Sequence, residues 1–328
     1  MTTVPESIPA RVKSSVITGL HKGWTGWLWL LKIIVPVSFA TALLVHFGVI
    51  YRMDFIFNPV MNLIGLSSEA VLPIIIGLFT GIYGAVAAMA VIPLSMAHMT
   101  LIAVFLLISH NLIQESIVQG RSGIHPVFAA LFRLFMSFCV TFVCSKIMGA
   151  TSGSPEAVAA VTLVHTPVPF TAMFMDWGMD ILRLAAKILL IIMPLMVVLD
   201  LAKSFSVIEY ITRLASPLLK LMGLSRPTGM LWLTASVFGL SYGAAVIVEE
   251  ARSHNYSRDE LIRLHLSVGI NHAMVEDPAL FLPLGVSAVW LWLPRLIAAI
   301  AATHIFFLIS FARRLYVKHA YHKKLCNH

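Results

Sequence analysis

The chain has 328 residues, of which 59% are hydrophobic and 12% are charged, and its mean hydropathy is +0.90. A soluble globular domain carries about 25% charged residues, so this composition excludes a water-soluble protein and indicates a chain that lies mostly in lipid. The net charge of +8 does not indicate nucleic-acid binding, because the basic residues lie at segment ends and in the tails, as is typical of membrane proteins.

Eight apolar segments, four in each half of the chain, predict membrane helices, because about 20 apolar residues suffice to cross a bilayer. In chain order they are 24–50, 70–92, 98–118, 125–149, 178–201, 228–250, 262–285 and 288–312. A shorter amphipathic stretch follows the first segment of each half, at 55–66 and 206–223, and predicts an interfacial helix. We therefore predict an all-α polytopic membrane protein.

The two halves of the chain resemble each other in short motifs at a nearly constant offset. The matching motifs are NPVMNLIGLS at 58–67 with SPLLKLMGLS at 216–225, GIYGAV at 81–86 with GLSYGAAV at 239–246, and SHNLIQES at 109–116 with NHAMVEDP at 271–278. Two half-molecules of apolar segments with glycine breaks at matching places are typical of a transporter whose site lies between its repeats.

The distribution of basic residues predicts the orientation of the chain. The tails, 1–23 and 313–328, carry Lys and Arg, whereas the linker at 150–177 carries neither. We therefore expect both termini in the cytoplasm, the linker on the other side, and membrane repeats at 24–149 and 178–312. The loop after the first segment is poor in basic residues and its counterpart in the second repeat is rich in them, so the repeats are predicted to be inverted.

Inversion conflicts with the number of apolar segments. It requires an odd number of crossings in each repeat, whereas each repeat has four apolar segments. One segment in each repeat must therefore break or re-enter, and the segments with glycines and polar residues are the candidates. Non-helical backbone at membrane depth is tolerated only where it is buried in protein or lines a wet cavity.

The polar residues of the repeated motif form the candidate binding site. His272 and Glu276 are four residues apart, which predicts one shared helical face, and His110 and Gln114 have the same spacing. Ionisable groups in a membrane segment are costly and usually face a cavity, a partner or a pathway. The residues of this predicted site are His110, Asn111, Gln114, Glu115, Asn271, His272, Glu276 and Asp277. The alternative is a helix that ends at the interface near Pro278, with its acids in water.

The glycines of the second matching motif are further candidates for the site. An unwound break would expose backbone groups to a solute, whereas close helix packing through small residues explains the same pattern. The residues predicted at these breaks are Gly81, Gly84, Gly239, Ser241 and Gly243.

Histidines with carboxylates also suggest a cation. Such a set can exchange a coupling proton near neutral pH, or hold a divalent cation through nitrogen and oxygen ligands. The candidate metal ligands are His110, Glu115, His272, Glu276 and Asp277, and no other cofactor is expected.

The repeat, the glycine breaks and the NHAMVEDP motif resemble the Gate, or nucleoside-recognition, membrane domain. That domain occurs in concentrative nucleoside transporters, in the membrane part of the bacterial ferrous-iron transporter B and in spore maturation proteins. The resemblance implies a gated translocation unit with discontinuous helices over nearly the whole chain, and it fixes no cargo. The chain has no GxxxxGK[ST] phosphate loop and lacks the extra helices of a full nucleoside transporter.

These features predict a secondary transporter or permease in a bacterial inner membrane, which moves a small polar solute or a divalent cation. Its expected partners are the lipid bilayer, the solute or ion, and a second copy or another subunit, but no nucleic acid. One alternative is a membrane assembly or regulatory subunit that transports nothing. Another is an intramembrane metal-dependent hydrolase, although HExxH is absent and we expect no enzyme.

Overall fold

The computed structural model describes residues 8–49, 54–150, 169–205, 207, 210, 214, 216–253 and 256–325. All regular elements among these residues are helices, which confirms the all-α prediction. Most of the predicted linker at 150–177 lies outside the described residues, as does part of the amphipathic stretch at 206–223.

The helices of the two halves follow one another in the same order. In the first half they are α1 (Ile8–His46), α3 (Asp54–Leu63), η1 (Ser68–Ala70), α4 (Val71–Thr80), α5 (Ile82–Met89), α6 (Met96–Ser109), α7 (Leu112–Arg121) and α8 (Pro126–Met148). In the second half they are α10 (Phe170–Ser204), α12 (Ser216–Leu221), α13 (Arg226–Ser253), α14 (Arg258–Ile270), α15 (Glu276–Phe281), η2 (Leu282–Leu284) and α16 (Ala288–Leu325).

Five of the described helical stretches are long and apolar enough to cross a membrane, which confirms a polytopic membrane protein. They are Ile8–His46, Met96–Arg121, Pro126–Met148, Phe170–Ala202 and Ala288–Tyr316. A sixth would be the pair Phe57–Leu63 and Ser68–Thr80, whose two helices are bent by 95° at their junction. This bent pair contains the first predicted amphipathic helix.

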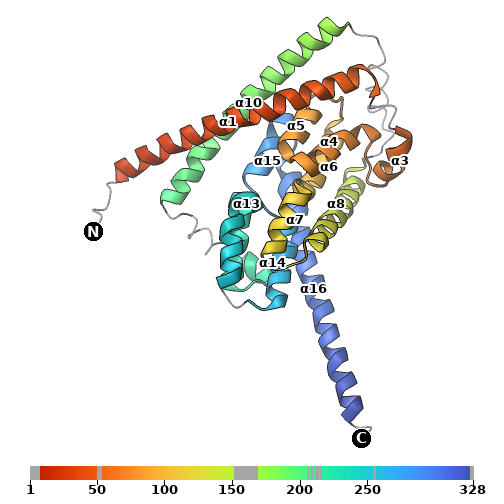
Figure 1. Ribbon diagram of the computed structural model, residues 1–328, viewed down its shortest axis with the longest axis vertical. Coiled ribbons are helices and arrows are strands. Elements are labelled where there is room, and N and C mark those ends of the chain that lie inside the picture. The colour runs from red at the N-terminus through yellow and green to blue at the C-terminus, as the bar shows by residue number, and fades with distance from the viewer. Residues whose placement is uncertain are drawn as a thin grey trace.

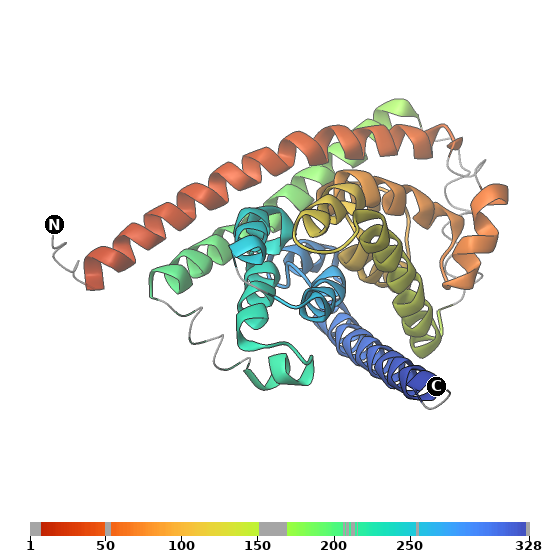
Figure 2. The same cartoon turned by 60° about the horizontal axis from the view of Figure 1, so that its bottom comes forward.

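The helices α1 and α10 form a long antiparallel pair along one side of the molecule (Figures 1 and 2). Trp27 Nε1 on α1 donates to the Ala185 carbonyl on α10 at 2.9 Å. Further along, Trp177 Nε1 on α10 donates to Ser38 Oγ on α1 at 3.2 Å. The order of these contacts reverses along the two helices, so α1 and α10 run in opposite directions.

The other elements also correspond between the halves. The helix α6 follows N-cap Ser95 and α14 follows N-cap Ser257, two serines that are 162 residues apart. The helix α8 corresponds to α16, although α16 continues beyond the body of the molecule toward the C-terminus (Figure 1). The internal repeat is therefore present in the structure. The inverted relation of the two halves and their orientation across the membrane stay predictions.

The predicted glycine breaks occur in both halves. Gly81 separates α4 from α5 with φ 90° and ψ −179°, and Gly239 interrupts α13 with φ 76° and ψ 170°. Glycine adopts a positive φ without the steric cost that other residues have. The predicted segments 70–92 and 228–250 are thus broken helices.

We predict that Gly19 allows the close approach of α1 to α10. A Cβ at Gly19 would lie 2.6 Å from the backbone Cα of Val197, whereas a Cβ at Gly26 on the same helix would meet nothing within 4 Å. Gly19→Ala should lower the melting temperature in detergent by a few degrees, as expected for about 1–3 kcal/mol of overpacking. Gly26→Ala should leave it unchanged or raise it, because alanine is the better helix former. Equal melting temperatures for the two variants would contradict this packing.

Candidate functional site

The repeated polar motif lies at a second break in each half, near the middle of the molecule (Figure 1). In the first half, His110 and Asn111 separate α6 from α7, and in the second half residues 271–275 separate α14 from α15. Asn111 has φ 46° and Ala273 has φ 45°, and these two residues occupy equivalent positions of the repeat. Each half therefore turns at the same place with a left-handed residue.

The prediction that the polar residues share helical faces is wrong. His272 precedes the turn at Ala273 and Glu276 follows it, so a non-helical stretch lies between them. The same holds for His110 and Gln114, which lie on the two sides of Asn111. The left-handed backbone redirects the chain, and the four-residue spacing no longer corresponds to one helical turn.

Backbone hydrogen bonds connect the two breaks within each half. The Asn111 N–H donates to the Gly77 carbonyl at 3.1 Å, and the equivalent Ala273 N–H donates to the Ala235 carbonyl at 3.0 Å. The acceptors are last-turn carbonyls before each glycine break, and the Gly77 carbonyl also accepts from the Gly81 N–H at 3.0 Å. The glycine break and the polar break of a repeat therefore form one unit.

Two buried arginines hold the helix ends at the polar breaks. Arg133 on α8 and Arg295 on α16 are both 0% exposed, and their guanidinium groups donate to carbonyls at the ends of α6 and α14. A cation at a helix C-terminus is favoured by the helix dipole and satisfies carbonyls that lack a helical partner. The equivalent bonds are Arg133 Nε to Ile108 O at 2.9 Å, Arg133 Nη2 to His110 O at 2.8 Å, Arg295 Nε to Ile270 O at 3.2 Å and Arg295 Nη2 to His272 O at 2.6 Å.

The two breaks bring histidines and carboxylates of both halves into one cluster. The rings of His110 and His272 are stacked with centroids 5.1 Å apart. His272 Nε2 lies 3.0 Å from Glu115 Oε2, and His110 Nε2 lies 3.2 Å from Asp277 Oδ2 and 3.4 Å from Glu115 Oε1. Glu115 also accepts from Arg133 Nη2 at 2.6 Å. We call these four residues, His110, Glu115, His272 and Asp277, the central cluster.

Hydrogen bonds to the backbone fix how the two imidazoles face the carboxylates. His110 Nδ1 lies 2.9 Å from the Leu106 carbonyl, and His272 Nδ1 lies 2.9 Å from the Val268 carbonyl. A carbonyl only accepts, so each Nδ1 carries the hydrogen and the lone pair of a neutral ring is on Nε2. That lone pair faces carboxylate oxygens, which are also acceptors. The arrangement is favourable only with a positive charge between them, either a proton on Nε2 or a metal ion.

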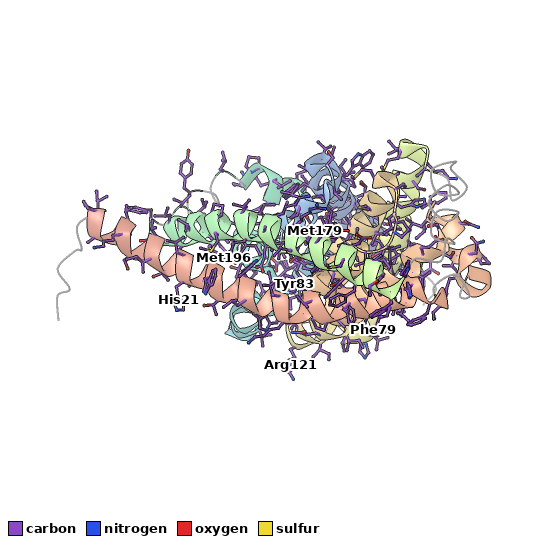
Figure 3. The ribbon with its side chains drawn as sticks, turned by 90° about the horizontal axis from the view of Figure 1, so that it is seen from above. His21, Phe79, Tyr83, Arg121, Met179 and Met196 are labelled. Carbon is purple, nitrogen blue, oxygen red and sulfur yellow. The ribbon has the colours of Figure 1, made fainter. Side chains whose placement is uncertain are left out.

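Glu276 lies beside the central cluster and not within it. Its side chain is half-buried, and Tyr83 Oη donates to Glu276 Oε1 at 2.6 Å. The Tyr83 ring packs edge-on against Trp29 of α1, with ring centroids 5.5 Å apart, and Figure 3 labels it behind the α1–α10 pair. Glu276 therefore connects α15 to the first repeat through α5.

The remaining predicted polar residues lie outside the central cluster. Gln114 is exposed on α7. Asn111 packs against the first glycine break, where a Cβ on Gly81 would lie 2.8 Å from its amide atoms. Asn271 is fully buried, and its amide oxygen and nitrogen have no partner among the described residues. Asn271 could therefore hydrogen-bond a bound molecule or water near the second break.

The residues predicted at the glycine breaks shape the backbone around the breaks. Gly84 lies inside α5, and a Cβ there would meet the side chains of Ile76 and Thr80 on α4, across the Gly81 break. Gly239 forms the second break beside Ala273, to which a Cβ would approach at 3.3 Å. The side chain of Ser241 and the surroundings of Gly243 lie outside the part of the chain that the structure describes.

Arg133 and Arg295 were missed by the sequence analysis. Each is an arginine in the apolar middle of a predicted membrane segment, and the two are 162 residues apart, as His110 and His272 are. A charge at membrane depth is costly and marks a functional or paired position. This rule, applied to 125–149 and 288–312, would have found both residues.

The fold and the central cluster define a polytopic membrane protein in which broken helices of two repeats meet at a buried polar site. Residues 27–154 match the model of the Gate family, which is described as nucleoside recognition. This match confirms the predicted resemblance over the first repeat, and it includes His110, Glu115 and Arg133.

One relative covers most of the chain. An uncharacterized membrane protein of Bacillus subtilis (strain 168), YvoD, is 28% identical over 296 residues, which are 89% of this chain and 94% of that protein. The similarity therefore extends through both repeats. No solved structure matches the chain.

We predict that Arg133 is essential for folding. Arg133→Ala removes the arginine from the buried Glu115 carboxylate and from two helix-end carbonyls, and removal of one member of a buried ion pair costs about 3–5 kcal/mol. Folded yield and melting temperature after purification in detergent should both fall strongly. The control is Arg121→Ala, because Arg121 is exposed at the end of α7 (Figure 3). If the two variants have equal stability, the assigned role of Arg133 is wrong.

Proposed function

We propose that the protein is a permease-like gate that moves a small polar solute or a divalent cation across a bacterial inner membrane. The central cluster is the binding site, and it is formed only when both repeats come together. One observation carries this proposal: four ionisable side chains from two equivalent helix breaks converge, buried, within apolar helices.

The arrangement of helix breaks favours transport. Transporters built from repeats bind their cargo near the bilayer midplane, at discontinuous helices from both halves. Here each half supplies a glycine break and a polar break, and backbone hydrogen bonds connect them. Movement at one break would therefore displace the other. The Gate description as nucleoside recognition supports a polar organic solute as one class of cargo.

Transport accounts for the site better than catalysis does. The pattern GxSxG occurs at 239–243, but it lies within the broken helix α13. A nucleophile elbow needs a sharp turn between a strand and a helix, and the described residues contain only helices. We therefore assign the histidines and carboxylates to binding a cargo or a coupling ion.

The cargo class can be identified by thermal shift on purified protein in nanodiscs. We expect one class among nucleosides, small organic acids and divalent cations to raise the melting temperature, because a ligand that binds only the folded state stabilises it. The shift should disappear in Glu115→Gln and shrink in Glu276→Ala. It should persist in Asp180→Asn, an exposed acid whose ion pair with Arg183 lies away from the site.

Uptake into proteoliposomes then tests transport itself. The ligand found by thermal shift should accumulate in vesicles that contain the wild-type protein or Asp180→Asn, and not in those that contain Glu115→Gln. Binding without uptake in any condition would favour the alternative of a regulatory subunit. Full uptake by Glu115→Gln would exclude the central cluster as the site.

A further inference from the structure

Three members of the central cluster are placed as metal ligands. One ligand atom each from His110, His272 and Asp277 lie within 4.8 Å of one another. A metal ion bound at about 2.0–2.2 Å from each ligand requires the ligand atoms to be about 3–4 Å apart. His110 Nε2 and Asp277 Oδ2 already have this separation, at 3.2 Å. Small side-chain movements would therefore complete the site.

The surroundings of the two imidazoles are those of metal-binding histidines. A ligating imidazole commonly donates its other N–H to a carbonyl or carboxylate, which fixes the ring and its tautomer. Both rings do so here, at Leu106 O and Val268 O, and both Nε2 atoms lie near the Glu115 carboxylate, at 3.4 Å and 3.0 Å. These bonds come from the turns of α6 and α14 just before the breaks, so the ligands are held by helical backbone.

The ligand types indicate the class of ion. Two imidazole nitrogens with a carboxylate oxygen suit divalent iron, manganese, cobalt or zinc. Calcium and magnesium prefer ligand sets made only of oxygen, and monovalent copper prefers thiolates and thioethers, which the three ligands do not include. Three protein ligands also leave coordination positions open, unlike a closed structural site of four ligands.

The charges around the cluster favour exchangeable binding. Arg133 and Arg295 offset the charges of Glu115 and Asp277, and Glu276 beside them adds one negative charge. A divalent ion therefore leaves one net positive charge in a buried site, which limits its affinity. Such a site can load and release an ion. Asp277 is the most exposed of the three ligands, with 13% of its side chain accessible.

We propose that the central cluster binds a divalent first-row transition metal ion through His110 Nε2, His272 Nε2 and the Asp277 carboxylate. Glu115, held by Arg133, supplies a neighbouring negative charge. The ion's role as cargo or coupling ion rests on the proposed function, but its binding does not. The two repeats thus provide one imidazole each to a single ion.

Cobalt(II) is the probe that tests this proposal, because its visible absorption reports both binding and ligand geometry. Full-length protein in nanodiscs, with any affinity tag removed, is titrated with Co²⁺ alone. We expect one Co²⁺ per chain with visible bands, which Zn²⁺ displaces. His272→Asn and the isosteric Asp277→Asn should each weaken binding at least about tenfold.

His304→Asn is the matched control. His304 lies in the second repeat, and its Nδ1 bonds the carbonyl of Ile300 one turn earlier, as His272 Nδ1 bonds Val268. It is exposed and lies away from the cluster, so Co²⁺ binding should be unchanged. Wild-type protein without the Co²⁺ bands, or equal binding by folded Asp277→Asn and His304→Asn, would overturn the proposal.

This experiment separates the metal site from the transport function. Solute uptake that depends on Glu115 but needs no metal, together with no Co²⁺ binding, would overturn the metal site and leave the proposed function standing. Co²⁺ binding that depends on Asp277, without uptake of any ion or solute, would support the metal site and contradict transport.

Discussion

The burial of one arginine at each polar break is the constraint on which the centre of this protein depends. A guanidinium group cannot be neutralised, and its burial is costly unless hydrogen bonds and an opposite charge compensate for it. Arg133 donates to carbonyls at the end of α6 and pairs with Glu115, and Arg295 donates to carbonyls at the end of α14. The helix α6 thus ends where Arg133 of α8 binds its last carbonyls, and α14 ends where Arg295 of α16 does so. The histidine at that point is thereby fixed against its partner from the other half.

The repeat is not fully symmetric, and the differences bear on function. Glu115 reaches Arg133 at 2.6 Å, whereas its counterpart Asp277 is one methylene shorter and lies closer to His110. One carboxylate is therefore committed to an arginine, while the other remains available to a cation. The same break forms a buried ion pair with an arginine in the first half and supplies the proposed metal ligand in the second.

Positions farther from the cluster differ between the halves as well. On α7, Ser116 and Gln119 are buried, and Ser116 Oγ and Gln119 Nε2 have no partner among the described residues. Their counterparts at the same repeat offset are Pro278 and Phe281, which are apolar. The helix that follows the polar break is therefore more polar on its buried side in the first half than in the second.

The sequence was sufficient to predict the helical membrane fold and the polar residues that converge in the central cluster, and it left the glycine motifs open between helix breaks and close packing. The orientation of the polar residues could not be predicted, because it depends on a left-handed backbone at Asn111 and Ala273. Alanine gives no local signal for that conformation, since a positive φ is unfavourable for it. Gln114 was consequently predicted in the site although it is exposed. The arginine bonds are contacts between distant segments, and no local pattern contains them.

The central claim is that histidines from both repeats bind the same ion, and pulsed electron paramagnetic resonance of bound Mn²⁺ tests it most directly. The account predicts magnetic coupling of one Mn²⁺ to two imidazole nitrogens in the wild-type protein. It predicts coupling to a single imidazole nitrogen in His110→Asn, which changes the first half of the chain, and in His272→Asn, which changes the second half. Coupling that is absent in the wild type, or unchanged in either variant, would contradict a centre shared by the two repeats.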